Sequence, residues 1–312
     1  MHHLRKIALK ALSYPIIDLK KNYKAKRKMV NALHPHFKPM YNLLDHRIMM
    51  GEREIPVRVF IPKEYKSPKV LLFFHGGGWV TGNIDSYTGI CANMANKTKH
   101  MVISVDYLLA PENPFPKGVE DCYYTAREIF LNKELLNCKA EDITLIGDSA
   151  GGNLAAAVSL MARDRGEFLP ARQILIYPAT YHDHSENSPF PSICENGKNY
   201  ILTAKDIQDY MALYVPDERD RMNPYVAPLV SKDLSNQPKT LIITAEYDPL
   251  RDEGEAYAKR LSEFGNNVMT YRMKDAVHGF LSLPKISEHV ITCYKIINRF
   301  LSGSMDWNDE TI

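Results

Sequence analysis

Short apolar runs that alternate with helical patterns dominate the chain from about residue 45 onward, and this alternation restricts the possible folds most strongly. Several runs are apolar at every position, which is typical of strands covered on both faces. The stretches between them have helical periodicity. We therefore expect an α/β protein with a mostly parallel sheet and helices on both sides of it. The expected strands are Val57–Ile61, Val70–Phe74, Val102–Asp106, Ile143–Gly147, Ile174–Tyr177, Thr240–Ala245 and Val268–Tyr271, and the expected helices are Ile84–Thr98, Lys117–Leu131, Ala150–Arg165, Glu253–Phe264 and Ile286–Leu301.

One interval interrupts this alternation. Residues 179–223 contain several prolines and helix-like pieces but no strand-like run. We interpret them as an insertion between consecutive strands, which forms a helical cap over one end of the sheet together with residues 1–45. The expected organisation is an N-terminal cap segment (1–45), a first part of the core (46–178), an inserted cap segment (179–223) and a second part of the core (224–312).

The strongest chemical signal is Gly147-Asp148-Ser149-Ala150-Gly151-Gly152, which follows an expected strand and opens an expected helix. A G-x-S-x-G pattern in this position predicts a nucleophile elbow, a tight turn that exposes a reactive serine. Free N–H groups at the helix start also favour negative charge beside that serine. Ser149 is therefore the expected nucleophile. The alternative is a glycine-rich turn in which Ser149 only caps the helix.

A second motif, His75-Gly76-Gly77-Gly78-Trp79, directly follows another expected strand. Consecutive glycines leave backbone N–H groups available to a ligand. An acyl-transfer enzyme needs such donors about 3 Å from the developing oxyanion, together with the N–H of the residue after the nucleophile. We expect Gly77, Gly78 and Ala150 to form this oxyanion hole. His75 and Gly76 are expected to support the loop structurally.

An acid and a base should follow the serine in that order along the chain. Asp248 stands where an expected strand ends, and His278 lies in a loop past the next strand. His278 would accept the serine proton and return it to the leaving alcohol, and Asp248 would orient the imidazole. Asp248 is preferred over Glu246, Asp252 and Asp275 because a short turn at the strand exit can reach the histidine.

Together these motifs resemble those of the bacterial hormone-sensitive-lipase-like (family IV) carboxylesterases. The segments Asp106–Glu112 and Asn223–Leu229 also look like parts of that family. The resemblance implies an α/β-hydrolase core of about eight strands with a helical cap, short- to medium-chain carboxylic esters as small-molecule substrates, and no cofactor. It also suggests a homodimer through the last strand or helix. Leu108 stands where the family commonly has arginine and Asn113 where histidine is frequent, so contacts to substrate and cap can differ.

The function expected from these residues is a serine carboxylesterase that forms an acyl-enzyme intermediate. An O-deacetylase of acetylated sugars or small metabolites would use the same residues with a smaller acyl pocket. An amidase or peptidase would share the chemistry. A non-catalytic small-ligand receptor on the same fold is the alternative of another class, and the presence of Ser149, Asp248 and His278 argues against it.

Composition agrees with an ordinary globular chain, with 45% hydrophobic residues and a net charge of +2. No apolar run approaches the roughly 20 residues of a membrane span. The five cysteines form no C-x-x-C pair and no secretory signal is evident, so we expect buried reduced thiols and a cytoplasmic location. The histidines of His34-Pro35-His36 and His182-Asp183-His184 have no third ligand cluster and are expected to be solvated, with no metal site.

Residues 1–30 carry many lysines and arginines with Asp18 as their one acid. We expect a helix whose apolar stripe packs on the body while its lysines are solvated, rather than a membrane-surface or nucleic-acid-binding helix. A separate hypothesis is that this basic excess favours acidic substrates or an anionic surface.

Overall fold

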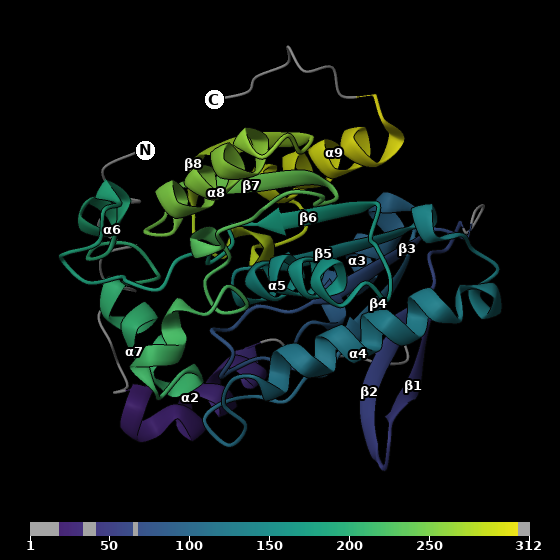
Figure 1. Ribbon diagram of the computed structural model, residues 1–312, viewed down its shortest axis with the longest axis horizontal. Helices are drawn as coiled ribbons and strands as arrows, with labels where there is room; N and C mark the ends of the chain where they lie inside the picture. Colours follow the sequence, from purple (N-terminus) through teal and green to yellow (C-terminus); the bar gives the residue numbers. More distant parts are fainter. Residues whose placement is uncertain (1–18, 34–41, 65–67, 305–312) are drawn as a thin grey trace.

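A single eight-stranded sheet organises the computed structural model, which describes residues 19–33, 42–64 and 68–304 (Figure 1). Its strand order is β1-β2-β4-β3-β5-β6-β7-β8. The β1–β2 and β2–β4 pairs are antiparallel, and every other neighbouring pair is parallel. The strands are β1 (Leu43–Met50), β2 (Arg53–Phe60), β3 (Val70–Phe74), β4 (Met101–Val105), β5 (Ile143–Asp148), β6 (Arg172–Ile176), β7 (Lys239–Tyr247) and β8 (Val268–Val277).

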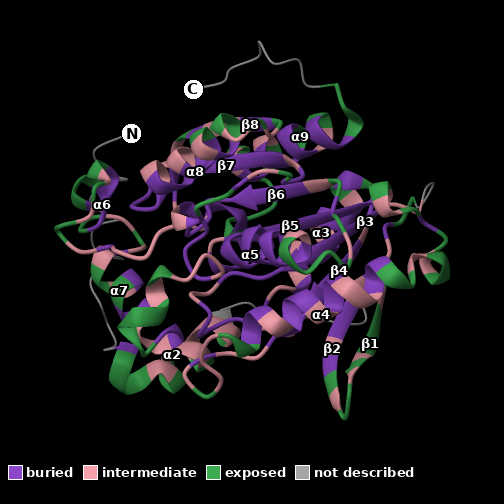
Figure 2. Ribbon diagram, viewed as in Figure 1, coloured by how far each residue is buried: buried purple, intermediate pink, exposed green. Residues whose placement is uncertain are grey.

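Helices cover both faces of this sheet. The helices α4, α5 and α8 contribute to one apolar core, and α3 and α9 contribute to a second core on the opposite face. Figure 2 shows the central strands buried between these layers. The helices are α2 (Leu19–Leu33), α3 (Thr88–Thr98), α4 (Lys117–Leu131), α5 (Ala150–Arg165), α6 (Pro191–Asn196), α7 (Ala204–Tyr214), α8 (Arg251–Glu263) and α9 (Glu288–Ser302), and short 3₁₀ turns include η4 (Glu218–Met222), η5 (Pro228–Val230) and η6 (Phe280–Ser282).

Strand β3 explains why the central strands are apolar at every position. Leu72 and Phe74 belong to the core beneath α4 and α5, whereas Leu71 and Phe73 belong to the core beneath α3 and α9. Successive side chains of a strand point to opposite faces of the sheet, so both sets must be hydrophobic when helices cover both faces. The expected α/β architecture with a mostly parallel sheet is confirmed.

Some elements and boundaries differ from the sequence-based expectations; β2, for example, begins at Arg53 and not at Val57. Strand β1 was not expected; it is an edge strand with mostly exposed side chains, so it lacks a continuous apolar run. Helix α3 begins at Thr88 and not at Ile84, because Asn83 and Ser86 close a turn through mutual hydrogen bonds. Strand β8 continues to Val277, directly before His278.

Helix α2 and the insertion, which belong to the two segments predicted to form a cap, lie together at one side of the sheet (Figure 1). Leu43–Asp45, expected at the end of the N-terminal cap segment, instead begin β1. Between β6 and β7 the chain forms α6, α7 and η4, and residues 179–223 contain no strand. Helix α2 packs against α7, although these helices are far apart in the sequence (Figure 1). The start of the N-terminal segment, including the helix expected before Pro15, lies outside the described residues, as do His34 and His36. Within the described parts of the chain, no helix is long and apolar enough to cross a bilayer.

Arg58 of β2 connects the antiparallel end of the sheet to the turn before α3. Its side chain is only 2% exposed and forms ion pairs with the half-exposed carboxylates of Asp45 and Asp85. It also donates hydrogen bonds to the Ile84 carbonyl and to the Thr88 hydroxyl. A buried guanidinium is tolerated only while such partners remain, so this cluster holds the start of α3 against β2.

We expect the double variant D45N/D85N to lose about 2–3 kcal/mol of unfolding free energy, because a buried charge then lacks its counterions. The R58M variant should lose less, since the two half-exposed carboxylates left behind can be hydrated. Urea unfolding at neutral pH measures both. A larger loss in R58M than in D45N/D85N would contradict this account.

Candidate active site

The turn between β5 and α5 places Ser149 in a strained conformation. Ser149 has φ 55° and ψ −120°, a region that residues with a side chain rarely adopt. The turn is tight because α5 lies directly against the end of β3. A Cβ atom on Gly151 would be 2.0 Å from the Phe74 carbonyl oxygen, so only glycine fits there. Strand β5, the sharp turn and the helix form the elbow that the sequence predicts.

Ser149, His278 and Asp248 form a continuous chain of hydrogen bonds. His278 Nε2 lies 2.9 Å from Ser149 Oγ, and His278 Nδ1 lies 2.7 Å from Asp248 Oδ2. Asp248 is fully buried, and its second oxygen accepts a hydrogen bond from the N–H of Leu250. The imidazole therefore has a fixed orientation, with one nitrogen facing the carboxylate and the other facing the serine.

The other acids considered for this position are engaged elsewhere. Glu246 accepts a hydrogen bond from the backbone N–H of Asp275, 29 residues away. Asp252 pairs with Arg251 and accepts a hydrogen bond from the N–H of Ser192 at the start of α6. Of the acids weighed for this position, Asp248 is the one that contacts His278 Nδ1.

The glycine loop after β3 has a conformation suited to binding an anion. Gly77 has φ 110°, and a Cβ atom there would be 2.2 Å from the Thr81 carbonyl oxygen. The Gly77 carbonyl accepts a hydrogen bond from the N–H of Thr81, which closes the loop. No described residue accepts a hydrogen bond from the N–H of Gly77 or Gly78. Ala150 is the first residue of α5, so its N–H has no acceptor within the helix.

Asp148 ties this loop to the elbow, a role that the sequence analysis did not anticipate. Its carboxylate accepts a hydrogen bond from the Gly76 N–H at 2.9 Å and hydrogen bonds from the hydroxyls of Tyr87 and Tyr177 at 3.2 and 3.4 Å. Burial raises the pKa of Asp148 to about 6, although the Gly76 hydrogen bond acts in the opposite direction. In the sequence, the one sign of this contact is that an acidic residue stands between Gly147 and Ser149.

His75 supports the same loop from below. Its ring is fully buried and stacks on Tyr107 with 4.3 Å between ring centroids. Its Nδ1 lies 2.8 Å from the Gly76 carbonyl oxygen, and the Tyr107 hydroxyl donates to the His75 carbonyl. Burial lowers the pKa of His75 to about 4, so the ring is neutral at physiological pH. It faces neither Ser149 nor His278 within hydrogen-bonding distance.

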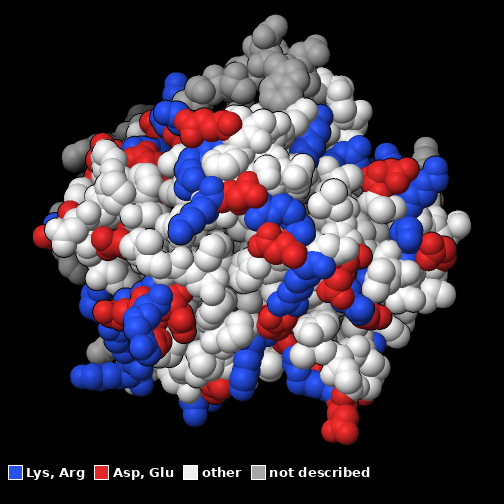
Figure 3. All heavy atoms as spheres, in the orientation of Figure 1, with Lys and Arg blue, Asp and Glu red and all other residues white. Residues whose placement is uncertain are grey.

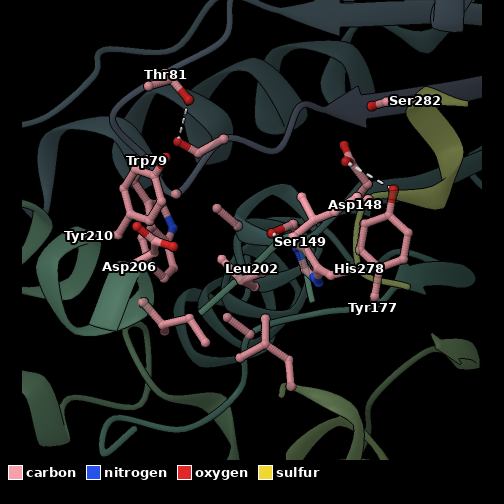
Figure 4. A pocket seen from close by; sticks show the side chains of 18 of the residues that line it. Trp79, Thr81, Asp148, Ser149, Tyr177, Leu202, Asp206, Tyr210, His278 and Ser282 are labelled. Atoms are coloured by element: carbon pink, nitrogen blue, oxygen red, sulfur yellow. Dashed lines mark hydrogen bonds between the residues drawn. The ribbon is translucent and has the colours of Figure 1, made fainter. Parts of the chain in front are cut away.

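A cavity of about 280 Å³ opens above Ser149 and His278 (Figure 4). Trp79 and Tyr210 form one side of it, and Tyr177 lies on the opposite side, beyond His278. Helix α2 contributes Lys26 and Val30 to the wall, and the insertion contributes residues from Ile201 to Tyr210. The two segments predicted to form a cap thus line the same cavity as the hydrogen-bonded triad.

Two further expectations were wrong. His184 is not solvated: its side chain is 1% exposed, and its Nε2 lies 2.9 Å from Glu253 Oε2 in the first turn of α8. The other oxygen of Glu253 accepts hydrogen bonds from the N–H groups of Thr180 and Tyr181, so this pair anchors the start of the insertion.

The second wrong expectation concerns a cysteine. Cys194 is exposed, whereas the remaining cysteines are buried as expected. The described residues include no cluster of three or more His, Cys, Asp or Glu side chains suited to a metal ion.

Comparison with known proteins decides the family. Residues 71–282 match the family described as the alpha/beta hydrolase fold. The chain belongs to the α/β-hydrolase family. An arylesterase of Saccharolobus solfataricus is 39% identical over 253 residues, which are 81% of each chain. Carboxylesterase NlhH of Mycobacterium tuberculosis is 38% identical over 236 residues, 74% of this chain and 73% of the relative.

Solved structures agree with this assignment. The hyperthermophilic esterase of Pyrobaculum calidifontis superposes with a TM-score of 0.87 at 34% identity, over 97% of this chain and 98% of that chain. This α/β-hydrolase is a carboxylesterase, an enzyme that hydrolyses carboxylic esters. The fold and the reaction class predicted from the sequence are therefore confirmed, and the receptor alternative is set aside.

The raised pKa of Asp148 makes a stability contribution that depends on pH. The folded protein holds this proton up to about pH 6, whereas an unperturbed carboxyl releases it near 3.8. The contribution is therefore fully present below about pH 4 and is lost as the pH rises through 6. The D148N side chain is neutral throughout, so the unfolding free energy of the wild type minus that of D148N should fall by on the order of 3 kcal/mol between pH 4 and 7. Urea titrations across this range test it, and a difference that does not change with pH would refute it.

Proposed function

We propose that this carboxylesterase works through a covalent acyl-enzyme on Ser149. The observation that carries the proposal is the hydrogen-bonded chain from Ser149 Oγ through His278 to Asp248, with distances of 2.9 and 2.7 Å. His278 Nε2 takes the serine proton as Oγ bonds to the ester carbonyl carbon. The bond to the alcohol then breaks, and the imidazolium gives its proton to the departing oxygen. Water repeats the sequence and releases the acid.

The negative oxygen of each tetrahedral intermediate is assigned to the N–H groups of Gly77, Gly78 and Ala150. The support is their conformation: Gly77 and Gly78 have positive φ, and Ala150 begins a helix whose dipole favours negative charge. His75 and Gly76 act as positioning residues. His75 packs beneath the glycine loop, and the N–H of Gly76 donates a hydrogen bond to Asp148.

The cavity supports short- to medium-chain acyl esters as the substrates. Its volume of about 280 Å³ lies near the lower end of the range for ligand pockets. Apolar side chains of α2 and the insertion, among them Val30, Leu202 and Ile207, form part of its lining. We propose that the N-terminal segment before β1 and residues 179–223 act as its cap. An O-deacetylase would use the same residues and would differ in accepting acetyl groups alone. Cytoplasmic location and a homodimer stay predictions.

Replacement of Ser149 by alanine is expected to lower kcat on p-nitrophenyl esters by at least about a thousandfold, because no nucleophile remains. The wild type should turn over esters from acetate to octanoate and fail on palmitate. Circular dichroism and thermal unfolding should show that S149A is folded. Activity confined to acetate would favour the deacetylase, and full activity in S149A would exclude this mechanism.

The variant D248N is expected to lower kcat by about a thousandfold or more with little change in KM. Asparagine can offer its N–H₂ to His278 Nδ1, which stabilises the tautomer that cannot accept the serine proton. E246Q is the matched control. Glu246 lies two residues before Asp248 in the sequence, but its carboxylate accepts a hydrogen bond from the backbone N–H of Asp275. Equal losses in the two variants would argue against Asp248 as the triad acid.

A further inference from the structure

The basic side chains of α2 fall into distinct structural roles. Arg27 donates hydrogen bonds to the carbonyls of Val80 and Ala110 and pairs with Glu112. Lys20 pairs with Asp209 of α7. Figure 3 shows basic and acidic side chains interspersed at the lower left, where α2 and α7 lie in Figure 1. Two basic side chains of α2, those of Lys20 and Arg27, thus attach this helix to its neighbours.

Lys26 differs from these residues because it lines the cavity that contains Ser149 and His278. It is half-buried, and no described residue forms an ion pair or a hydrogen bond with its ammonium group. Val30, one helical turn later, lines the same cavity, so this face of α2 is directed at the site. Lys28 stands about 200° further around the helix and is exposed to solvent.

Two carboxylates line the same cavity, and both are already engaged. Asp148 accepts the hydrogen bonds from Gly76 and two tyrosines described above, and Asp206 belongs to the first turn of α7. Its Oδ2 accepts hydrogen bonds from the N–H and the hydroxyl of Thr203, in the capping box that starts α7. The positive end of the α7 dipole also stabilises it there. Asp206 and Lys26 do not form an ion pair. The cavity therefore offers a substrate one cation that has not been neutralised by the protein.

We propose that Lys26 binds a carboxylate carried by the substrate, several bonds away from the ester that Ser149 attacks. This inference rests on the proposed function and narrows its substrate class to esters with a second, anionic group. The methylene stem of Lys26 can pack along the apolar wall while the ammonium meets the anion. Such a half-screened pair discriminates by about three- to tenfold. The carboxylate can belong to a dicarboxylic acid or to the alcohol.

The test compares esters that differ only in charge. On the acyl side, p-nitrophenyl hemiglutarate is paired with the p-nitrophenyl ester of 5-methylhexanoic acid, in which an isopropyl group replaces the carboxylate. On the alcohol side, 4-acetoxybenzoate is paired with 4-isopropylphenyl acetate. Rates are corrected with S149A as a blank. In one of the two pairs, the wild type should show a kcat/KM ratio of anionic to neutral ester about three- to tenfold higher than the K26M variant.

The variant K28M is the matched control. It removes the same charge from the same helix, so it reproduces any long-range effect on anionic substrates without altering the cavity. Its ratio should equal that of the wild type, and D206N should raise the ratio further. Equal ratios in wild type and K26M for both pairs, or equal changes in K26M and K28M, would overturn the proposal. Failure of the proposed function would appear differently, as no turnover of the neutral esters by the wild type.

Discussion

The buried carboxylate of Asp148 is the interaction on which the geometry of the site depends. It is the last residue of β5, so its backbone leads directly into the strained turn at Ser149. Its side chain holds the Gly76 N–H and the hydroxyls of Tyr87 and Tyr177. The elbow, the glycine loop, the turn before α3 and the end of β6 are thereby fixed relative to one another. A catalytic oxyanion site requires such rigidity, because its donors must be in place before charge develops.

The topology of the sheet explains how the site residues, which are far apart in sequence, come together. Strands β3, β5, β7 and β8 run parallel, so the residues that follow them all lie at one edge of the sheet. That edge receives the glycine loop, Ser149, Asp248 and His278, each from a different strand. The strain at Ser149 is maintained by the close packing of Gly151 on β3, which leaves the turn no room to relax.

The sequence predicted those parts of the site that local rules determine. Ser149, Asp248 and His278 each follow an apolar run in the required order, and the glycine loop is recognisable by its composition. The role of Asp148 could not be predicted, because its partners Gly76, Tyr87 and Tyr177 meet only in the folded sheet. His184 was misjudged for the same reason: its partner Glu253 is distant in sequence, and a polar loop gives no sign of burial. Strand β1 was not predicted, because an exposed edge strand needs no apolar pattern.

The roles of the basic residues of α2 follow from where this helix packs. A helix laid against α7 and the loop after β4 needs cations on the faces that meet Asp209 and Glu112, and Lys20 and Arg27 supply them. The same placement brings the next face of α2 to the wall of the cavity, which Lys26 lines. Helical geometry thus directs Lys20 and Arg27 toward neighbouring elements, where they hold α2 in place, and Lys26 toward the cavity, where it faces the proposed substrate. Because specificity lies in the site and not in the fold, side chains that α2 and the insertion place around the cavity can set which esters this scaffold accepts.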